Sequence, residues 1–421
     1  MRLYNLTVIQ LKFYHDRIHR FFVIPAGRRS RKTLIGKRKI LLEAIYNKGR
    51  YFCGAPTWQQ AKDIFWKNLK KDTKLLRQKS PNESELCVTL WNGSEIQVVG
   101  LDRPERIEGQ IWHGCLITEF GNLKDTAWPE NIRPLLSDTN GFAIIEGVPE
   151  GRNHYYDVAL DACDQALPET REKIGAFCES QRDKEWVYYS WFSSDVLPDS
   201  EIEAVKMHLD EKTFLQEYQG SFESFEGLAY YTFGKHNFEM VEYDPNSNQR
   251  ISIGMDFNVN PMTASIGYIK GDTFKQFDEI YLQHSNTYEI VEEIKRKYPA
   301  SLCDIYPDST GKHESSNSTK SDLQILRNAE FIIYARSKPP YVKDRVNSMN
   351  SLIKNINGNT RYKVNPKNCP KTVNDFNKVE RLSDGRLNKK QEDQGLKHMS
   401  DNIGYLVDYN WPIKNNGVII S

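Results

Sequence analysis

The sequence predicts a protein of two α/β domains, on three observations. A chain of 421 residues is longer than one hydrophobic core usually serves. From Arg20 to about Gly151, short apolar runs alternate with helical stretches, which is the pattern of a parallel sheet flanked by helices. A second series of strands begins at Arg250. We therefore expect domains at residues 1–185 and 246–421, joined by a lid or linker subdomain at 186–245.

The elements of the first domain follow from the spacing of apolar residues. Four strands are expected at Phe21 to Ile24, Tyr51 to Ala55, Cys115 to Ile117 and Phe142 to Ile145. Helices are expected at Lys32 to Tyr46 and Trp58 to Leu76, and Asn92-Gly93 predicts the turn of a hairpin within Cys87 to Val99. Between the domains, Ser200 to Tyr218 is expected to be mostly helical.

The second domain begins with three consecutive strands, then a helix and a fourth strand, which resembles a ribonuclease-H-like core. The strands are expected at Ile251 to Asp256, Thr263 to Ile269, Phe274 to Tyr281 and Leu302 to Tyr306, and the helix at Tyr288 to Lys297.

Composition and charge limit the class of protein. There are 57 Lys and Arg against 56 Asp and Glu, but residues 1–50 and 336–397 are rich in cations, and either region could face a phosphate backbone. The seven cysteines are scattered without C-x-x-C spacing, which argues against a disulfide framework and a zinc site. No run is apolar enough to cross a bilayer and no signal pattern is present, so we expect a soluble protein of a reducing cytoplasm, without membrane contact.

A phosphate-binding loop is predicted between the first strand and the first helix. The segment has the G-x-x-x-x-G-K-[ST] spacing, in which backbone N–H groups cradle phosphate oxygens, a lysine neutralises their charge and a hydroxyl ligates Mg²⁺. Its residues are Ala26, Gly27, Arg28, Arg29, Ser30, Arg31, Lys32 and Thr33. Both glycine positions are altered, to Ala26 and Arg31, and the alternative is a basic turn on a solvated face.

A second element of such ATPases is an apolar strand that ends in acids. Cys115 to Ile117 is followed by Thr118, where an aspartate is expected, and by Glu119. The glutamate would orient and activate the attacking water, whereas the missing aspartate helps to hold Mg²⁺. The alternative is a buried strand that ends in an unrelated glutamate. The first domain is therefore predicted to be a P-loop ATPase of the ASCE or RecA-like class.

Three aspartates are candidate metal ligands in the second domain. Asp256 ends one predicted strand, Asp308 follows another, and Asp401 shares a helix face with His398. Nucleases that use two metal ions need several carboxylates from different elements, because the ions must clamp both oxygens around one phosphate. A single aspartate at a strand end is more often a turn former, so the prediction depends on three in this order.

These motifs together resemble the large terminase subunits of tailed bacteriophages and prophages, over nearly the whole chain. The resemblance is carried by residues 26–33, Ala55-Pro56-Thr57, Arg103 to Gly109, Thr118-Glu119-Phe120 and Gly147 to Asn153, and by the three aspartates. It implies a DNA-packaging ATPase joined to a metal-dependent endonuclease. By position, Arg28 or Arg29 would contact phosphate, and Arg106, or failing that Arg103, would act as an arginine finger. The alternative for Arg106 is a surface ion pair with Glu105 or Glu108.

The resemblance also implies cofactors and partners. The cofactors would be ATP and Mg²⁺, with Mn²⁺ as an alternative in the nuclease. The partners would be double-stranded DNA, a portal protein and a small terminase subunit, and the chain would form a homo-oligomeric ring on the procapsid but a monomer in solution, in the cytoplasm of the host bacterium. Two competing hypotheses are a terminase whose ATPase is impaired by Arg31 and Thr118, and a non-catalytic DNA-binding protein of the capsid vertex.

Overall fold

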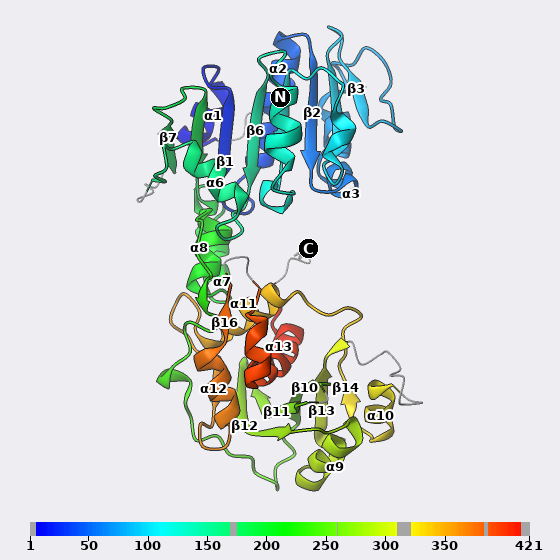
Figure 1. Cartoon of the computed structure of the whole chain (residues 1–421), viewed down its shortest axis with the longest axis vertical. Helices are drawn as coiled ribbons and strands as arrows, with labels where there is room; N and C mark the ends of the chain where they lie inside the picture. Colours follow the sequence, from blue (N-terminus) through cyan, green and yellow to red (C-terminus); the bar gives the residue numbers. More distant parts are fainter. Residues whose placement is uncertain (1–5, 169–174, 259, 310–320, 383–385, 414–421) are drawn as a thin grey trace. The chain divides into compact units, whose positions relative to one another are not determined.

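The computed structural model describes residues 6–168, 175–258, 260–309, 321–382 and 386–413. The chain forms two compact units (Figure 1). The first unit comprises residues 1–202 and 215–224, and the second comprises residues 203–214 and 225–421. No helix among the described residues is long and apolar enough to span a membrane.

The first unit is built on an eight-stranded sheet with the order β3-β4-β2-β5-β6-β1-β8-β7. Neighbouring strands are parallel except at the two edges, where β3 and β7 run antiparallel to β4 and β8. The strands are β1 (Phe21–Pro25), β2 (Arg50–Ala55), β3 (Cys87–Thr89), β4 (Glu95–Gly100), β5 (Gly114–Ile117), β6 (Phe142–Gly147), β7 (Ala176–Glu179) and β8 (Trp186–Ser190). The strands predicted in this domain and the hairpin at Asn92-Gly93 are present.

Helices and short helical turns connect these strands. The α-helices are α1 (Val8–His15), α2 (Lys32–Tyr46), α3 (Trp58–Ala61), α4 (Lys67–Asp72), α5 (Arg133–Leu135), α6 (His154–Asp161), α7 (Asp199–Lys206) and α8 (Glu211–Gln219). The turns are η1 (Lys62–Trp66) and η4 (Ala127–Ile132), which are π-helical, and η2 (Pro104–Ile107), η3 (Phe120–Asn122) and η5 (Ser193–Asp195). Helix α2 has its predicted limits. The single helix predicted at 58–76 is wrong, because η1 interrupts it and the helix ends at Asp72.

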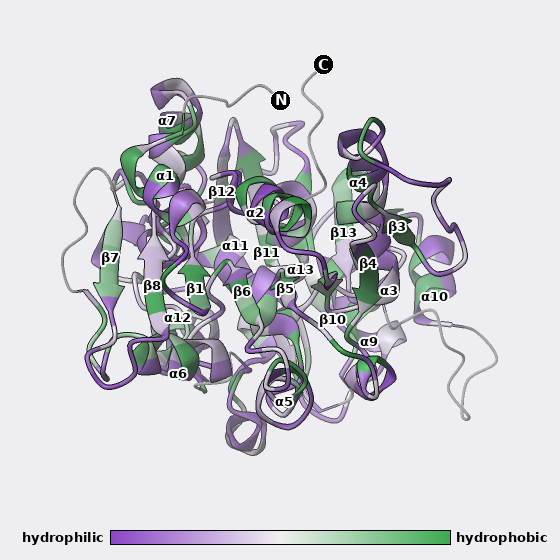
Figure 2. Ribbon diagram, turned by 90° about the horizontal axis from the view of Figure 1, so that it is seen from above, coloured by the Kyte–Doolittle hydropathy of each residue, from purple (hydrophilic) through white to green (hydrophobic). Residues whose placement is uncertain are grey.

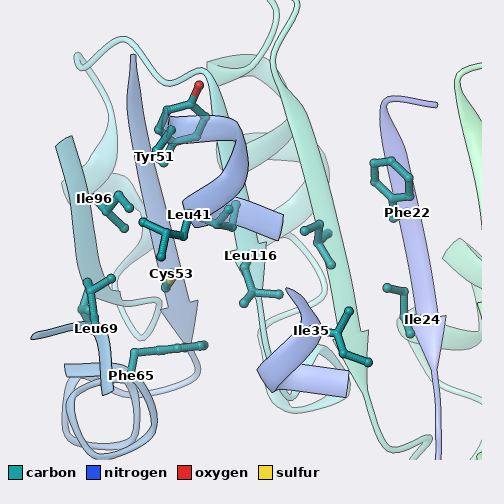
Figure 3. Packing of buried hydrophobic residues seen from close by; sticks show 14 of the residues in the cluster. Phe22, Ile24, Ile35, Leu41, Tyr51, Cys53, Phe65, Leu69, Ile96 and Leu116 are labelled. Atoms are coloured by element: carbon teal, nitrogen blue, oxygen red, sulfur yellow. The ribbon is translucent and has the colours of Figure 1, made fainter. Parts of the chain in front are cut away.

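Strand β6 lies between β1 and β5, so the strand before the phosphate-binding loop and the strand before Glu119 are separated by one strand. This order agrees with the predicted ASCE class. Helix α2 packs on one face of the sheet, where its Ile35 belongs to the same hydrophobic cluster as Ile24 and Leu116 (Figure 3). All five residues of β1 are buried, and Figure 2 colours this strand as hydrophobic. The loop after β1 therefore starts from a fully packed strand.

The second unit contains a six-stranded sheet with the order β14-β13-β10-β11-β12-β15. Strands β10, β11 and β12 are antiparallel neighbours, and β13 runs parallel to β10, as the ribonuclease-H-like prediction requires. The strands are β10 (Ile251–Asp256), β11 (Met262–Lys270), β12 (Thr273–Leu282), β13 (Cys303–Pro307), β14 (Ile332–Ile333) and β15 (Tyr362–Val364), with a separate pair formed by β9 (Gly227–Leu228) and β16 (Glu380–Arg381). The helices are α9 (Thr287–Lys297), α10 (Asp322–Asn328), α11 (Val342–Ile353), α12 (Pro370–Lys378) and α13 (His398–Asn410), with the turns η6 (Lys235–Asn237), η7 (Ala300–Leu302) and η9 (Lys389–Gln394).

The predicted linker at 186–245 contains elements of both units. Its first residues form β8, which pairs with β1 and extends the first sheet. The helical stretch predicted at 200–218 forms α7 and α8, with a break between residues 206 and 211. The domain limits at 185 and 245 therefore stay a prediction, although β8 itself belongs to the first sheet.

Candidate nucleotide-binding and metal-binding sites

The loop at residues 26–31 adopts a conformation suited to binding phosphate. Arg31, at the second glycine position of the motif, has φ 66° and ψ 14°, which is the left-handed region that favours glycine. The arginine therefore keeps the backbone turn that glycine would provide, at a cost of about 1–2 kcal/mol. Two side chains from other segments hold the loop in place. Gln10 Nε2 and Trp191 Nε1 donate hydrogen bonds to the Ser30 carbonyl at 3.0 and 2.8 Å.

The strain at Arg31 leads to a prediction about stability. We expect Arg31→Gly to unfold at a higher temperature than Arg31→Ala, because both remove the same side chain but only glycine relieves the left-handed strain. The difference should be about 1 kcal/mol, or about 2–4 °C in a melting experiment. Glu292, an exposed position inside α9, is the control: alanine there should be more stable than glycine. The same order at both positions would contradict the assigned backbone strain.

Lys32 and Glu119 are near enough to interact electrostatically. Lys32 is 6% exposed and its Nζ donates to the Gly27 carbonyl at 3.3 Å, so the ammonium group lies inside the loop. Burial lowers the pKa of Lys32, and the charges of Glu119 and Glu146 oppose that shift. Glu119 follows β5 with φ 53° and caps η3. The predicted lysine and glutamate thus lie in one electrostatic environment.

The two arginines of the loop have different surroundings. Arg28 forms an ion pair with Glu217 of α8, and its backbone N–H donates to the Glu217 carbonyl at 2.7 Å. Arg29 is exposed and also has a positive φ, 55°. Arg29 is therefore the more accessible candidate for a phosphate, whereas Arg28 would first have to leave Glu217.

Arg106 lies on η2 and is exposed, as is Arg103. The ion pair considered as its alternative role is not formed: among the salt bridges of the described residues, none joins Arg106 to Glu105 or Glu108. The carboxylate of Glu108 accepts a hydrogen bond from Asn131 Nδ2 instead. The guanidinium of Arg106 is thus presented to solvent.

Glu146, the penultimate residue of β6, was not anticipated as a site residue. It is fully buried, and burial raises its pKa to about 7, against the opposing effects of Lys32, Thr33 and Thr118. The signal in the sequence is an acid at the end of the apolar run Phe142-Ala143-Ile144-Ile145, on a strand beside the phosphate-binding loop.

Asp256 and Asp308 meet at one edge of the second sheet. Asp256 ends β10, and Asp308 follows β13, whose Pro307 is the register partner of Met255. The Asp308 N–H donates to the Met255 carbonyl at 3.0 Å, which fixes the two residues side by side. Both are buried. The parallel pairing of β10 and β13 explains why two acids far apart in the sequence converge.

Asp401 is placed by the close approach of α13 to β10. A Cβ on Gly254 would lie 2.3 Å from the Asn402 carbonyl oxygen, so only glycine allows α13 to lie against the strand. Asp401 is in the first turn of α13, and its Oδ1 accepts a hydrogen bond from Arg345 Nη2 of α11 at 2.6 Å. Arg345 is 5% exposed and stacks on Tyr405 at 4.5 Å. Arg345 was not anticipated from the sequence.

The three aspartates act on one another electrostatically. Burial raises the pKa of Asp256 to about 7, the charges of Asp401 and Asp308 add to that rise, and Arg345 opposes it. Within the described ranges, however, no three His, Cys, Asp or Glu side chains are arranged as a ready metal site. The donor set suits Mg²⁺ or Mn²⁺, which prefer carboxylate oxygens. Asp401 and Asp308 are near enough to Asp256 to raise its pKa, and Arg345 brings a positive charge to the three aspartates.

Two other acids of the second sheet, Asp304 and Glu279, have structural partners. Asp304 pairs with Arg250, whose Nε lies 2.8 Å from Asp304 Oδ2. Glu279 accepts hydrogen bonds from the backbone N–H groups of Lys371 and Thr372 at 2.8 and 2.9 Å, so it caps α12. His398 is buried, and its Nδ1 lies 4.0 Å from Asp256 Oδ2. Of these, only His398 borders the aspartate site.

Comparison with known proteins relates the chain to one family. No family model matches the sequence. The large terminase subunit of Thermus virus P23-45 is 24% identical over 277 residues, which cover 59% of this chain and 56% of that protein. The large terminase subunit of Escherichia phage T5 is 22% identical over 222 residues, covering 52% of this chain and 47% of that protein. The chain is similar to phage large terminase subunits. It spans about half the length of the curated terminases it matches.

Solved structures show that the fold is that of a large terminase. The large terminase of a thermophilic bacteriophage matches with a TM-score of 0.63 and 14% identity, over 96% of this chain and 99% of that chain. The same terminase in complex with ADP matches with a TM-score of 0.62 and 15% identity, over 96% of this chain and 99% of that chain. The matches cover nearly the whole chain, so the likeness in fold extends over both units.

Proposed function

We propose that this chain is the large subunit of a phage terminase, which moves double-stranded DNA into a procapsid with ATP and cuts it with a metal-dependent nuclease. The observation that carries the proposal is that one chain of terminase fold holds both a phosphate-binding loop and an edge of three aspartates. Arg31 keeps the left-handed backbone of the loop, which supports a working nucleotide site. Cleavage and translocation are thereby assigned to separate units of the chain.

In the ATPase half, residues 26–33 bind the phosphates of ATP. Lys32 neutralises phosphate charge from inside the loop, and the Thr33 hydroxyl lies at the first turn of α2, where Mg²⁺ is expected. Glu119 orients the water that attacks the terminal phosphate. The exposed guanidinium of Arg106 serves as a finger on the nucleotide of a neighbouring subunit in the ring, where its charge stabilises the transition state.

In the nuclease half, Asp256, Asp308 and Asp401 hold Mg²⁺ or Mn²⁺. The bound ions would polarise a DNA phosphate and activate a water. Arg345 must release Asp401 for that carboxylate to become a ligand, because the hydrogen bond at 2.6 Å occupies Asp401 Oδ1. His398 borders Asp256 and can order the attacking water.

Exposed cations of residues 336–397 provide the contact with DNA. Part of that basic region is internal, because Arg345 pairs with Asp401 and Arg361 with Asp272. The exposed members are Lys338, Lys354, Lys367, Lys371, Lys378, Arg386, Lys389 and Lys390. Contacts of this kind go to phosphates and carry no sequence information. A small terminase subunit would choose the cutting site, and a portal protein would receive the ring, in the cytoplasm of the host bacterium.

ATP hydrolysis stimulated by DNA tests the motor. We expect the purified chain to hydrolyse ATP faster with double-stranded DNA, and Lys32→Ala to reduce that rate at least about tenfold, because about 1.4 kcal/mol or more of transition-state stabilisation is lost. Lys71→Ala, which removes an exposed lysine at the end of α4, is the control and should leave the rate unchanged. Equal rates for the original chain and Lys32→Ala would reject the motor and leave the impaired-ATPase hypothesis.

A further inference from the structure

Glu146 lies at the centre of the nucleotide-binding edge of the first sheet. Its strand, β6, runs between β1 and β5, and Glu146 is the register partner of Ile24. Side chains of a strand alternate between faces, and Ile144 belongs to the cluster under α2. Glu146, two residues further on, therefore points to the same face, beneath the helix that begins at Lys32.

The groups around Glu146 are those of the phosphate-binding loop. A Cβ on Gly36 would lie 3.7 Å from Glu146 Oε2, which places the carboxylate against the first turns of α2. The ammonium group of Lys32 and the hydroxyls of Thr33 and Thr118 are close enough to lower the pKa of Glu146. Thr33 is the hydroxyl expected to ligate Mg²⁺, so the carboxylate and this hydroxyl share one environment.

The carboxylate of Glu146 is buried without hydrogen bonds. Within the described part of the chain, neither Oε1 nor Oε2 makes a regular hydrogen bond, although the hydroxyls of Thr33 and Thr118 are near enough to favour the charged form. An unpaired buried carboxylate is unfavourable by several kcal/mol, and a bound ion is one of the ways in which native proteins satisfy such a group. The first unit thus tolerates an unsatisfied acid at the point where a nucleotide and its metal would bind.

Position 118 explains why an acid is needed there. Strand β5 is followed by Thr118, where the aspartate that helps to hold Mg²⁺ is expected, and threonine carries no charge. Thr118 follows Ile117, which pairs with Ile145 of β6, so Glu146 is the neighbour of Thr118 on the adjacent strand. The glutamate side chain is one methylene longer than aspartate, and it approaches the Thr33 hydroxyl from one strand further along the sheet.

We propose that Glu146 supplies the carboxylate that faces the Mg²⁺ of bound ATP, directly or through a water, in place of the acid missing at position 118. This inference rests on the proposed ATPase function. Glu146 holds the metal and Glu119 orients the water, so the two acidic roles are divided between adjacent strands β6 and β5. The ammonium of Lys32 interacts electrostatically with both carboxylates and offsets their charge until Mg²⁺ and phosphate arrive.

Binding of ATP-γ-S with Mg²⁺ and with EDTA tests the role of Glu146. For the original chain, we expect Mg²⁺ to tighten binding. Glu146→Gln keeps the shape of the side chain and should bind ATP-γ-S in EDTA as tightly as the original chain does. In Mg²⁺ its affinity for ATP-γ-S should be about 10–100-fold lower than that of the original chain. The Mg²⁺ concentration for half-maximal ATP hydrolysis should rise by a similar factor. Adding Thr118→Asp to Glu146→Gln should restore both, because it returns a carboxylate to the site.

Each result separates the possible explanations. Glu130→Gln, at an exposed acid of η4, is the matched control and should behave as the original chain. A purely structural role of Glu146 would weaken binding equally with Mg²⁺ and with EDTA, and Thr118→Asp would not restore it; that outcome overturns the inference, as does an unchanged Mg²⁺ dependence. If the original chain itself binds no ATP-γ-S, the proposed function fails rather than this assignment.

Discussion

Asp256→Asn is expected to abolish DNA cleavage and to make the fold more stable at alkaline pH. Loss of a metal ligand should reduce cutting of supercoiled plasmid in Mn²⁺ by more than about 100-fold, because even outer partners of metal ligands are worth about 10–100-fold. The gain in stability has a separate cause. Burial and the charges of Asp401 and Asp308 raise the pKa of Asp256 to about 7 in the folded chain, from an ordinary value of 3.8.

The sign of the pH dependence follows from proton uptake. Between about pH 4 and pH 7 the folded chain holds a proton on Asp256 that the unfolded chain has lost, so the free energy of unfolding falls as the pH rises through this range. Asparagine has no such proton. At pH 8 without metal the variant should be more stable by roughly 2–4 kcal/mol, and at pH 4 nearly equal to the original chain.

Urea unfolding in EDTA at both pH values, with a plasmid assay in Mn²⁺, measures both effects. Asp304→Asn is the control, because Asp304 pairs with Arg250 away from the three aspartates: it should lose stability and keep cleavage. Cleavage by Asp256→Asn at the rate of the original chain would exclude Asp256 as a ligand. A stability gain that is the same at pH 4 and pH 8 would exclude its titration as the cause.

Arg345→Met is expected to destabilise the second unit by roughly 3–5 kcal/mol in EDTA at pH 8. Removing one partner of a buried ion pair leaves the other charge uncompensated, and here Arg345 pairs with Asp401 and also opposes the negative charge of Asp256. Methionine has a similar length and no charge, so the change isolates the guanidinium. Mn²⁺ should restore much of the lost stability, because a divalent cation neutralises the same carboxylates.

Urea unfolding with and without Mn²⁺ tests this balance. The stabilisation by Mn²⁺ should be larger in Arg345→Met than in the original chain, where the metal must displace the guanidinium from Asp401. Arg250→Met removes a more exposed ion pair and should cost less than about 1 kcal/mol, without altering the effect of Mn²⁺. An equal Mn²⁺ effect in all three proteins would show that Arg345 does not compete with metal.

The sequence predicts much of the fold because its signals are local. The apolar run at Phe21 to Ile24 and the helical spacing of Lys32 to Tyr46 each require only their own residues, and both are present in the structure. The convergence of Asp256 and Asp308 was also predictable, because one ends and the other follows a strand of the same expected sheet. In contrast, the break of the helix at 58–76 depends on a π-helical turn that apolar periodicity does not reveal.

The unpredicted parts of the sites depend on distant contacts. Arg345 contacts Asp401 because α11 packs against α13. The sequence of either helix contains no signal that predicts this packing. In the sequence, Glu146 is only a polar residue at the end of a predicted strand. Its nearness to the phosphate-binding loop depends on the sheet order, in which β6 lies between β1 and β5. Strand β8 was assigned to a linker because its role is defined by pairing with β1, more than 160 residues earlier.

Glu146 is also close in the chain to a residue that contacts α8. The next residue, Gly147, accepts a hydrogen bond from Ala26 N–H at 3.2 Å, and Gly151 N–H donates to Gln216 Oε1 at 3.0 Å. Gln216 lies in α8, whose residues 211–214 belong to the second unit and 215–219 to the first. Five residues and one hydrogen bond thus separate Glu146 from the helix through which the chain passes from one unit to the other.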